Sequence, residues 1–213
     1  MSSIFEKNYL DIYPIFFFNF LYLTFGFKVI IQYKQARPNI DSSAFIAQNA
    51  VISGNVTIGK NVGIWYGCVL RGDVSAIQIG ENSNIQDGTT IHGTRANHVQ
   101  NKTGDSAADV IIGKNVTVGH NCIIHACTIE DESFVGMGSI MMDLSKVEKH
   151  GMLAAGSVLS PKKVVKSGEL WAGVPAKFFR KLSEEEIAYI ATSANNYSLL
   201  AKEYKHESTV INQ

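Results

Sequence analysis

The sequence predicts an all-β solenoid, a left-handed parallel β-helix of hexapeptide repeats, with a C-terminal α-helix packed along it. Three observations lead to this fold class: apolar residues recur at every sixth position, the turns between them are rich in Gly and Asn, and the chain ends in an amphipathic segment. A six-residue period is neither that of a helix nor that of a simple alternating strand. Short strands with a turn after each one produce such a period, and stacked units of this kind form a solenoid.

Two apolar rows establish the register of the repeat. The main row begins with Ile46, Ile52, Ile58, Ile64 and Leu70. A companion row lies two residues earlier, and therefore on the same strand face, at Ala50, Val56, Val62 and Cys68. After a break the main row resumes at Ile79 and continues in later runs to Leu159. A β-sandwich of short strands is the alternative, but sandwich strands do not share one phase over so long a stretch.

Residues 1–28 form an aromatic-rich N-terminal extension that differs from the rest of the chain. The uncharged run from Ile12 to Phe27 contains Pro14 and is slightly short for a bilayer span. It lacks the basic start and the cleavage site of a signal peptide. Three interpretations stay open: a membrane-lying anchor, a segment buried against a partner, or an upstream stretch translated from a misassigned start. We expect any membrane contact to be confined to these residues.

The remaining chain divides into the β-helix, residues 29–176, and a C-terminal helix and tail, residues 177–213. Ser183 and Glu186 have the spacing of a capping box, and Glu184 suits the positive end of a helix dipole. Apolar residues then follow helical spacing, so we expect a helix from about Ser183 to Tyr204 with its apolar face along the solenoid.

Composition limits the partners and the compartment. The formal net charge of the 213 residues is zero, so nothing favours nucleic acid as a partner. The three cysteines, Cys68, Cys122 and Cys127, all fall on inward positions. An odd number of buried thiols argues against a disulfide framework and for a reducing compartment, so we expect a cytoplasmic protein.

Three histidines are the candidate metal ligands. His92 and His125 each follow a core residue directly, Ile91 and Ile124, and occupy the same outward phase, whereas His120 lies in a different phase. One prism-shaped coil therefore should not bring His120 to the other two. A neighbouring subunit of a cyclic homotrimer could supply it, which would make three shared sites. Three neutral imidazoles with one open position suit catalytic zinc, while the alternative is a set of surface histidines without metal.

The motifs around these histidines resemble those of gamma-class carbonic anhydrases and their bacterial relatives. The resemblance covers about residues 29–205 and lies in these segments: Arg71-Gly72-Asp73, Asn84-Ile85-Gln86-Asp87-Gly88, Ile91-His92-Gly93, the stretch from Val118 to His125, Gly173-Val174-Pro175-Ala176 and Ser193-Ala194-Asn195-Asn196-Tyr197.

This resemblance implies a homotrimer with a metal at each subunit interface, held by His92, His120 and His125. The metal would be zinc, with iron or cobalt as alternatives. Gln86 would orient the metal-bound solvent, and Tyr197 would reach from the C-terminal helix towards a site. The residues implied at the trimer interface are Arg71 paired with Asp73, Asp87 holding Arg71, and Asn84 supporting the same region.

The implied reaction is the reversible hydration of carbon dioxide to bicarbonate by a metal-bound hydroxide, since zinc lowers the pKa of its water to about 7. The chain departs from the archetype on the proton route. Val74 stands where the archetype has Glu, and the loop from Thr94 to Ala108 has Asp105 as its only acid. His98 in that loop has a pKa suited to proton transfer, against the alternative of a solvated loop histidine.

Two other functions stay open. One is a hexapeptide-repeat acyltransferase that uses a single histidine as general base. The other is a metal-binding structural trimer with little activity.

Overall fold

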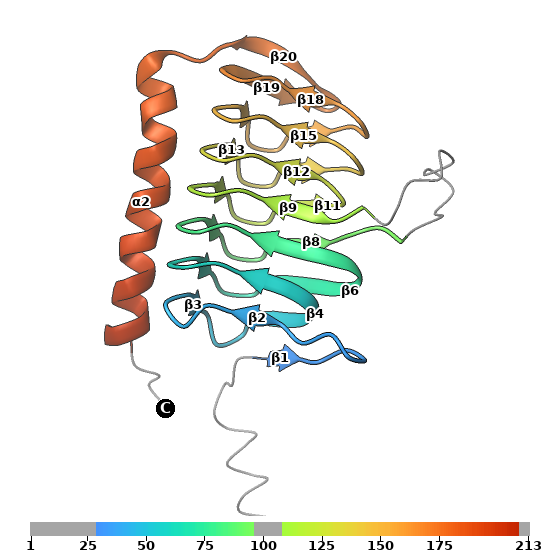
Figure 1. Cartoon of the computed structure of the whole chain (residues 1–213). Coiled ribbons are helices and arrows are strands. Elements are labelled where there is room, and N and C mark those ends of the chain that lie inside the picture. The colour runs from blue at the N-terminus through green and yellow to red at the C-terminus, as the bar shows by residue number, and fades with distance from the viewer. Residues whose placement is uncertain (1–28, 96–107, 209–213) are drawn as a thin grey trace, which may run out of the picture.

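The computed structural model describes residues 29–95 and 108–208 of the chain. They form a parallel β-solenoid with three walls, and helix α2 (Glu184–Glu207) runs along one wall (Figure 1). The predicted solenoid with a C-terminal helix is confirmed. The aromatic extension, residues 1–28, lies outside the described residues, as do His98 and Asp105.

Two walls belong to one 12-stranded sheet, because β4 (Val51–Ile58) and β6 (Val69–Ile79) pass round the corner between them. Wall one also contains β1 (Val29–Ile31), β8 (Thr90–His92), β11 (Ile123–His125), β14 (Ile140–Met141) and β17 (Val158–Leu159). Wall two also contains β2 (Asn39–Ile40), β9 (Val110–Ile112), β12 (Thr128–Ile129), β15 (Lys146–Val147) and β18 (Val164–Val165).

Wall three is an 8-stranded sheet. Its strands are β3 (Phe45–Ile46), β5 (Gly63–Ile64), β7 (Asn84–Ile85), β10 (Thr117–Val118), β13 (Phe134–Val135), β16 (Met152–Leu153), β19 (Glu169–Gly173) and β20 (Ala176–Lys181). Helix α2 contacts β3, β5, β7 and β10, so it covers the outer face of this wall.

The register follows from the hexapeptide period, since three hexapeptides make one coil. Ile123 pairs with Ile140 and Phe134 pairs with Met152, so parallel partners in the later coils are 17 or 18 residues apart along the chain. Some steps are longer. Arg71 and His92 are 21 residues apart, and His92 and His125 are 33 residues apart because the segment from Gly93 to Asp109 is inserted between β8 and β9. The insertion leaves the stacking of the walls intact.

The core is the set of apolar rows read from the sequence. The main-row residues Ile52, Ile64, Leu70, Ile85, Ile91 and Ile124 are all completely buried. The companion row and the three free cysteines are buried with them. The turns are tight, and Asn61, Asn82, Asn115 and Asn121 adopt positive φ there, which Asn tolerates better than most residues.

The C-terminal region consists of strand β20 followed by helix α2. Strand β20 pairs antiparallel with β19, with a register shift beside Leu170 and Trp171. Ser183 then caps α2, and the capping box with Glu186 is present as predicted. The helix ends three residues later than expected, at Glu207. Within the described residues, no helix combines the length and the apolarity that crossing a membrane would require.

Candidate metal centre

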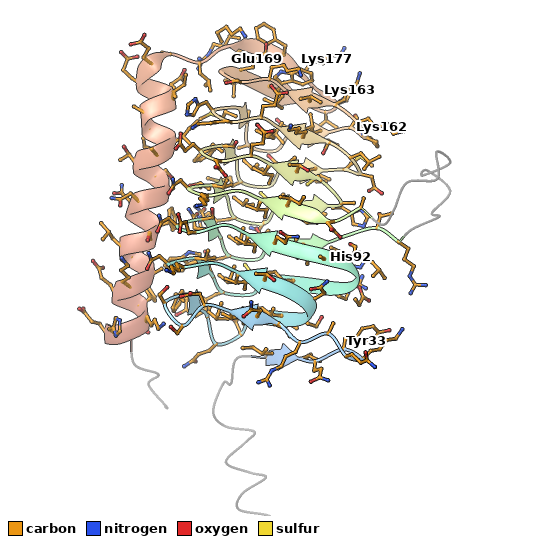
Figure 2. All side chains as sticks on the ribbon, viewed as in Figure 1. Tyr33, His92, Lys162, Lys163, Glu169 and Lys177 are labelled. Atoms are coloured by element: carbon orange, nitrogen blue, oxygen red, sulfur yellow. The ribbon has the colours of Figure 1, made fainter. Side chains whose placement is uncertain are left out.

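The candidate residues gather at two corners of the solenoid. At the first corner, which contains His92 and His125, the chain passes from wall one to wall two. At the second corner, which contains Gln86 and His120, the chain passes from wall three to wall one. Figure 2 shows His92 on the opposite side of the solenoid from α2.

The first corner stacks three side chains on neighbouring strands of wall one. Arg71 on β6 pairs in register with His92 on β8, and His92 pairs with His125 on β11. Each follows an inward core residue directly, so alternation along the strand turns all three side chains outward. The prediction that His92 and His125 share one phase is therefore confirmed by the register.

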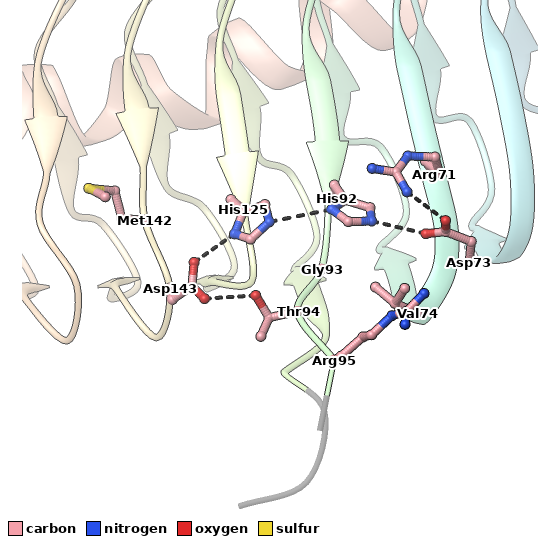
Figure 3. A pocket seen from close by; sticks show the side chains of 10 residues that line it. All are labelled: Arg71, Asp73, Val74, His92, Gly93, Thr94, Arg95, His125, Met142 and Asp143. Carbon is pink, nitrogen blue, oxygen red and sulfur yellow. Dashed lines mark hydrogen bonds and ion pairs between the residues drawn. The ribbon is translucent and has the colours of Figure 1, made fainter. Parts of the chain in front are cut away.

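The two imidazoles face each other, and each is held from behind by a carboxylate (Figure 3). His92 Nδ1 lies 3.4 Å from His125 Nε2. The other nitrogen of His92, Nε2, lies 2.9 Å from Asp73 Oδ1, and His125 Nδ1 lies 2.6 Å from Asp143 Oδ1. Asp143 is fixed in turn by the Thr94 hydroxyl, which donates to Oδ2 at 2.7 Å.

These contacts assign the protons of the two rings. A carboxylate only accepts hydrogen bonds, so each ring donates its N–H to its own carboxylate. Burial lowers the pKa of His92 below its usual value and so favours the neutral ring. The Asp73 hydrogen bond acts in the opposite direction but is the smaller effect. Burial also opposes ionisation of Asp73 and Asp143, but hydrogen bonds from His92 and Arg71 and from Thr94 and His125 outweigh it, so both carboxyl pKa values are lowered.

This arrangement fits a metal ion. With both N–H groups turned to the carboxylates, two nitrogen lone pairs point at each other across 3.4 Å. Tetrahedral zinc with Zn–N bonds of about 2.0–2.1 Å separates its nitrogen ligands by roughly 3.3–3.4 Å, so the spacing suits a shared cation. A carboxylate on the far nitrogen of each ring is the usual support of a metal-ligating histidine.

One chain supplies only part of such a site. Across residues 29–95 and 108–208, no three His, Cys, Asp or Glu side chains converge closely enough to hold a metal ion. The cleft at the first corner is lined by Arg71, Asp73, Val74, His92, Gly93, Thr94, Arg95, His125, Met142 and Asp143. His120 is not among them, as its different phase predicted.

The second corner carries His120 together with residues that the family resemblance singles out. His120 Nδ1 lies 2.9 Å from Asp87 Oδ2, and 39% of the His120 side chain is exposed. Gln86 and Asn84 are buried beside it, with Gln86 Nε2 donating to Asn84 Oδ1 at 3.1 Å. Helix α2 brings Tyr197 to this region, where burial first and then the nearby Asp87 carboxylate raise the pKa of its phenol.

The interface residues also have clear partners within one chain. Arg71 Nη1 donates to Asp73 Oδ2 at 2.5 Å, so this pair forms without a second subunit. Asp87 is paired with His120 and accepts a hydrogen bond from the Tyr66 backbone amide. The pairing of Arg71, Asp73 and Asp87 across a subunit boundary concerns a second chain and stays a prediction.

Asp143 and Thr94 are candidate site residues that the sequence reasoning missed. The signal for Asp143 was present: it follows His125 by 18 residues, the nominal length of one coil, and its carboxylate reaches the His125 ring from the next coil. Thr94 could not be found this way, because it stands at the neck of the inserted segment. Its backbone forms a bridge with Ala108, and this bridge brings the two ends of the insertion together.

Comparisons with known proteins decide the family. No protein-family model matches the sequence. Gamma carbonic anhydrase 1, mitochondrial, from Arabidopsis thaliana is 47% identical over 171 residues, 80% of this chain. A carbonic anhydrase from Geobacillus kaustophilus is 35% identical over 177 residues, which are 83% of this chain and 91% of that protein. The chain belongs to the gamma carbonic anhydrase family.

The match to the family covers different shares of its members. This chain spans 60% of the length of the Arabidopsis relatives. Among solved structures, a hexapeptide transferase family protein from Anaplasma phagocytophilum is 54% identical, with a TM-score of 0.76 over 83% of this chain and 98% of that one. The gamma carbonic anhydrase family and a protein with a transferase name thus share this solenoid.

Proposed function

We propose that the protein is a metal-dependent enzyme of the carbonic anhydrase type, which interconverts carbon dioxide and bicarbonate at sites shared between subunits of a homotrimer. The observation that carries the proposal is the pair of facing imidazole nitrogens, 3.4 Å apart, with a carboxylate on the far side of each ring. Family membership supports the choice of reaction.

His92 and His125 would hold the metal from one chain, and His120 from the neighbouring chain would complete the set. Zinc, iron or cobalt bound there would lower the pKa of a coordinated water to about 7 and so supply a nucleophile for carbon dioxide at neutral pH. Asp73 and Asp143 each accept the N–H of the far ring nitrogen, which fixes the tautomer and the orientation of both rings and leaves the lone pair of the other nitrogen directed at the metal.

The residues of the second corner would position the reactants. Gln86 carries an amide, which can hold an oxygen of water or bicarbonate without titrating itself. Tyr197, on α2, would limit the space beside Gln86. The two corners lie on different edges of one prism, so a cyclic arrangement is the simplest one in which the first corner of one copy meets the second corner of the next.

The test is a metal analysis and a hydration assay on the full chain, purified without oxygen. We expect about one metal ion per chain, because each subunit boundary of a cyclic trimer makes one site. Stopped-flow hydration of carbon dioxide should be well above background in loaded protein and at background in His92→Ala. Loaded protein that hydrates carbon dioxide only at the background rate would exclude this reaction.

One specific observation favours a second candidate, an acyltransferase. The hydrogen bond from His92 to Asp73 is the kind of imidazole–carboxylate pair that serves general-base catalysis, and a similar solved protein is named as a hexapeptide transferase. Metal-free protein that turns over an acyl-coenzyme A donor, with the turnover lost in His92→Ala, would support this candidate over the first.

A further inference from the structure

A row of four polar side chains crosses wall three beneath α2 and ends at the second corner. We call Gln86, Asn84, Thr117 and Ser193 the polar row. Each is at most 6% exposed. Asn84 Nδ2 donates to Thr117 Oγ1 at 3.0 Å, and the hydroxyls of Thr117 and Ser193 lie 3.2 Å apart. With the contact between Gln86 and Asn84, the row is continuous from the second corner to the helix.

The polar row exists because two outward positions of the solenoid are covered. Asn84 and Thr117 are register partners on β7 and β10, each beside an inward core residue, Ile85 or Val118. On an open wall such outward residues would meet water. Here α2 lies against β7 and β10 (Figure 1), so their polar atoms must find partners inside the protein. Ser193, on the buried side of α2, is one of these partners.

The direction of the hydrogen bonds along the row is fixed by one backbone group. Asn84 Nδ2 also donates to the carbonyl oxygen of Val116 at 3.4 Å, and a carbonyl oxygen can only accept. The amide nitrogen of Asn84 therefore faces Val116 and Thr117, and its oxygen faces Gln86. Gln86 must then turn its own nitrogen towards Asn84, which leaves its Oε1 directed away from the row. Among the described residues, none donates a hydrogen bond to this oxygen.

We propose that Thr117 and Ser193 are positioning residues: they hold the Asn84 amide in the orientation that the Val116 carbonyl selects, and so keep the Gln86 amide with its oxygen, and not its nitrogen, towards the second corner. The proposal rests on the proposed function, in which that corner meets the metal ligands of a neighbouring copy. An oxygen at this place accepts hydrogen bonds, so it favours a ligand oxygen that carries a hydrogen: water, hydroxide or the hydroxyl of bicarbonate. It disfavours an anion without hydrogen, such as carbonate.

The test compares two substitutions of one side chain. Thr117→Val removes the hydroxyl at nearly constant shape, and Thr117→Ser keeps it. The first readout is the pair of side-chain NH₂ signals of Gln86 in nitrogen-15 NMR spectra of metal-free protein, identified by their loss in Gln86→Glu. We expect wild type and Thr117→Ser to show the same two signals with slow solvent exchange. In Thr117→Val the signals should move and exchange faster.

The second readout is hydration of carbon dioxide by metal-loaded protein. We expect kcat/KM to fall roughly three- to tenfold in Thr117→Val, the cost of one misaligned hydrogen bond, with metal content unchanged. Thr117→Ser should restore it. Ser193→Ala should cost about twofold, because Thr117 keeps its contact with Asn84. The matched control is Ser139→Ala. It removes a buried hydroxyl that lies outside the polar row and donates to the backbone carbonyl of Ala154, and it should leave kcat/KM unchanged.

The two readouts separate failure of this inference from failure of the proposed function. The NH₂ signals need neither metal nor turnover, so they test the polar row even if carbon dioxide is not the substrate. Gln86 signals in Thr117→Val that match wild type in position and exchange would overturn the inference, as would a Thr117→Ser protein that behaves like Thr117→Val. Wild-type protein without hydration activity but with the expected Gln86 signals would count against the proposed function alone.

Discussion

The two corners of the solenoid are built in opposite ways. At the first corner, two imidazoles from adjacent strands of one wall face each other, and the surrounding carboxylates fix both rings. At the second corner, a single exposed imidazole stands beside amides that are buried under α2. Under the proposed function the first corner binds metal and the second positions reactants. At the first corner the regular stacking of strands fixes the positions of the side chains. At the second corner the docked helix fixes them.

The largest effect should come from separating the two corners genetically. His92→Ala and His120→Ala proteins should each lose bound metal. Mixed and reassembled at equal ratio, they should regain about a quarter of the wild-type content, because about three-quarters of random cyclic trimers are mixed and each has one intact site of three. Metal per chain after co-refolding is the measurement.

The matched control for this experiment is a mixture of His92→Ala and His125→Ala. Both changes damage the same corner, so no arrangement of these chains restores a complete site. Recovery of metal in this control, or none in the His92→Ala and His120→Ala mixture, would show that the ligands are not divided between subunits in the proposed way.

A smaller effect should follow from the carboxylate behind His125. In Asp143→Asn the amide oxygen can still accept the N–H of His125, but the negative charge is gone. The second oxygen, which accepted from the Thr94 hydroxyl, is replaced by an NH₂ group. We expect metal affinity to fall by about tenfold or more, the usual range for such supporting residues. Competition with a chelator measures it. The control is Asp131→Asn, which changes a carboxylate that accepts from the Lys114 backbone amide and should leave the metal affinity unchanged.

The smallest effect concerns the far end of the helix that covers the second corner. Glu186 closes the capping box and pairs with both terminal nitrogens of Arg180. These contacts lower the pKa of the Glu186 carboxyl from 4.5 to about 2, with the Arg180 hydrogen bond as the largest cause and the Ser183 backbone amide as the next. Glu186→Gln should lower Tm by about 1–3 °C at pH 7 without changing metal content.

The sign of the pH dependence follows from the lowered pKa. Ionised Glu186 is favoured in the folded state, so its contribution is complete above the unfolded value of 4.5 and is lost as pH falls towards about 2. The difference in Tm between wild type and Glu186→Gln should therefore shrink across this range. Glu184→Gln, in the same turn, is the control. A difference that stays constant down to pH 2 would contradict the assigned pairing.

Much of the first corner could be predicted from the sequence, because a solenoid repeats its geometry. The phase of His92 and His125 relative to Ile91 and Ile124 was enough to place the rings on one wall, and the register confirms it. Counting one coil forward from His125 would also have reached Asp143. The local pattern could not supply Thr94, since its position depends on how the inserted segment closes on Ala108.

The second corner was less predictable for a physical reason. The resemblance indicated Gln86, Asn84 and Tyr197, but their surroundings depend on the position of α2 along wall three. Helical spacing predicts which face of α2 is apolar and does not predict which strand each turn meets. The contact between Ser193 and Thr117, 76 residues apart in the chain, appears only when the helix is docked.

The reversal of direction at β20 closes one end of the parallel ladder. A parallel ladder offers a template to any further strand that arrives in the same orientation, and an uncovered rung could recruit another molecule and start a fibre. Here the last rung runs backwards, has a register shift and carries Lys177, Arg180 and Lys181. Such a strand is a poor seed for growth along the axis, so this end of the solenoid does not offer a regular parallel edge to another molecule.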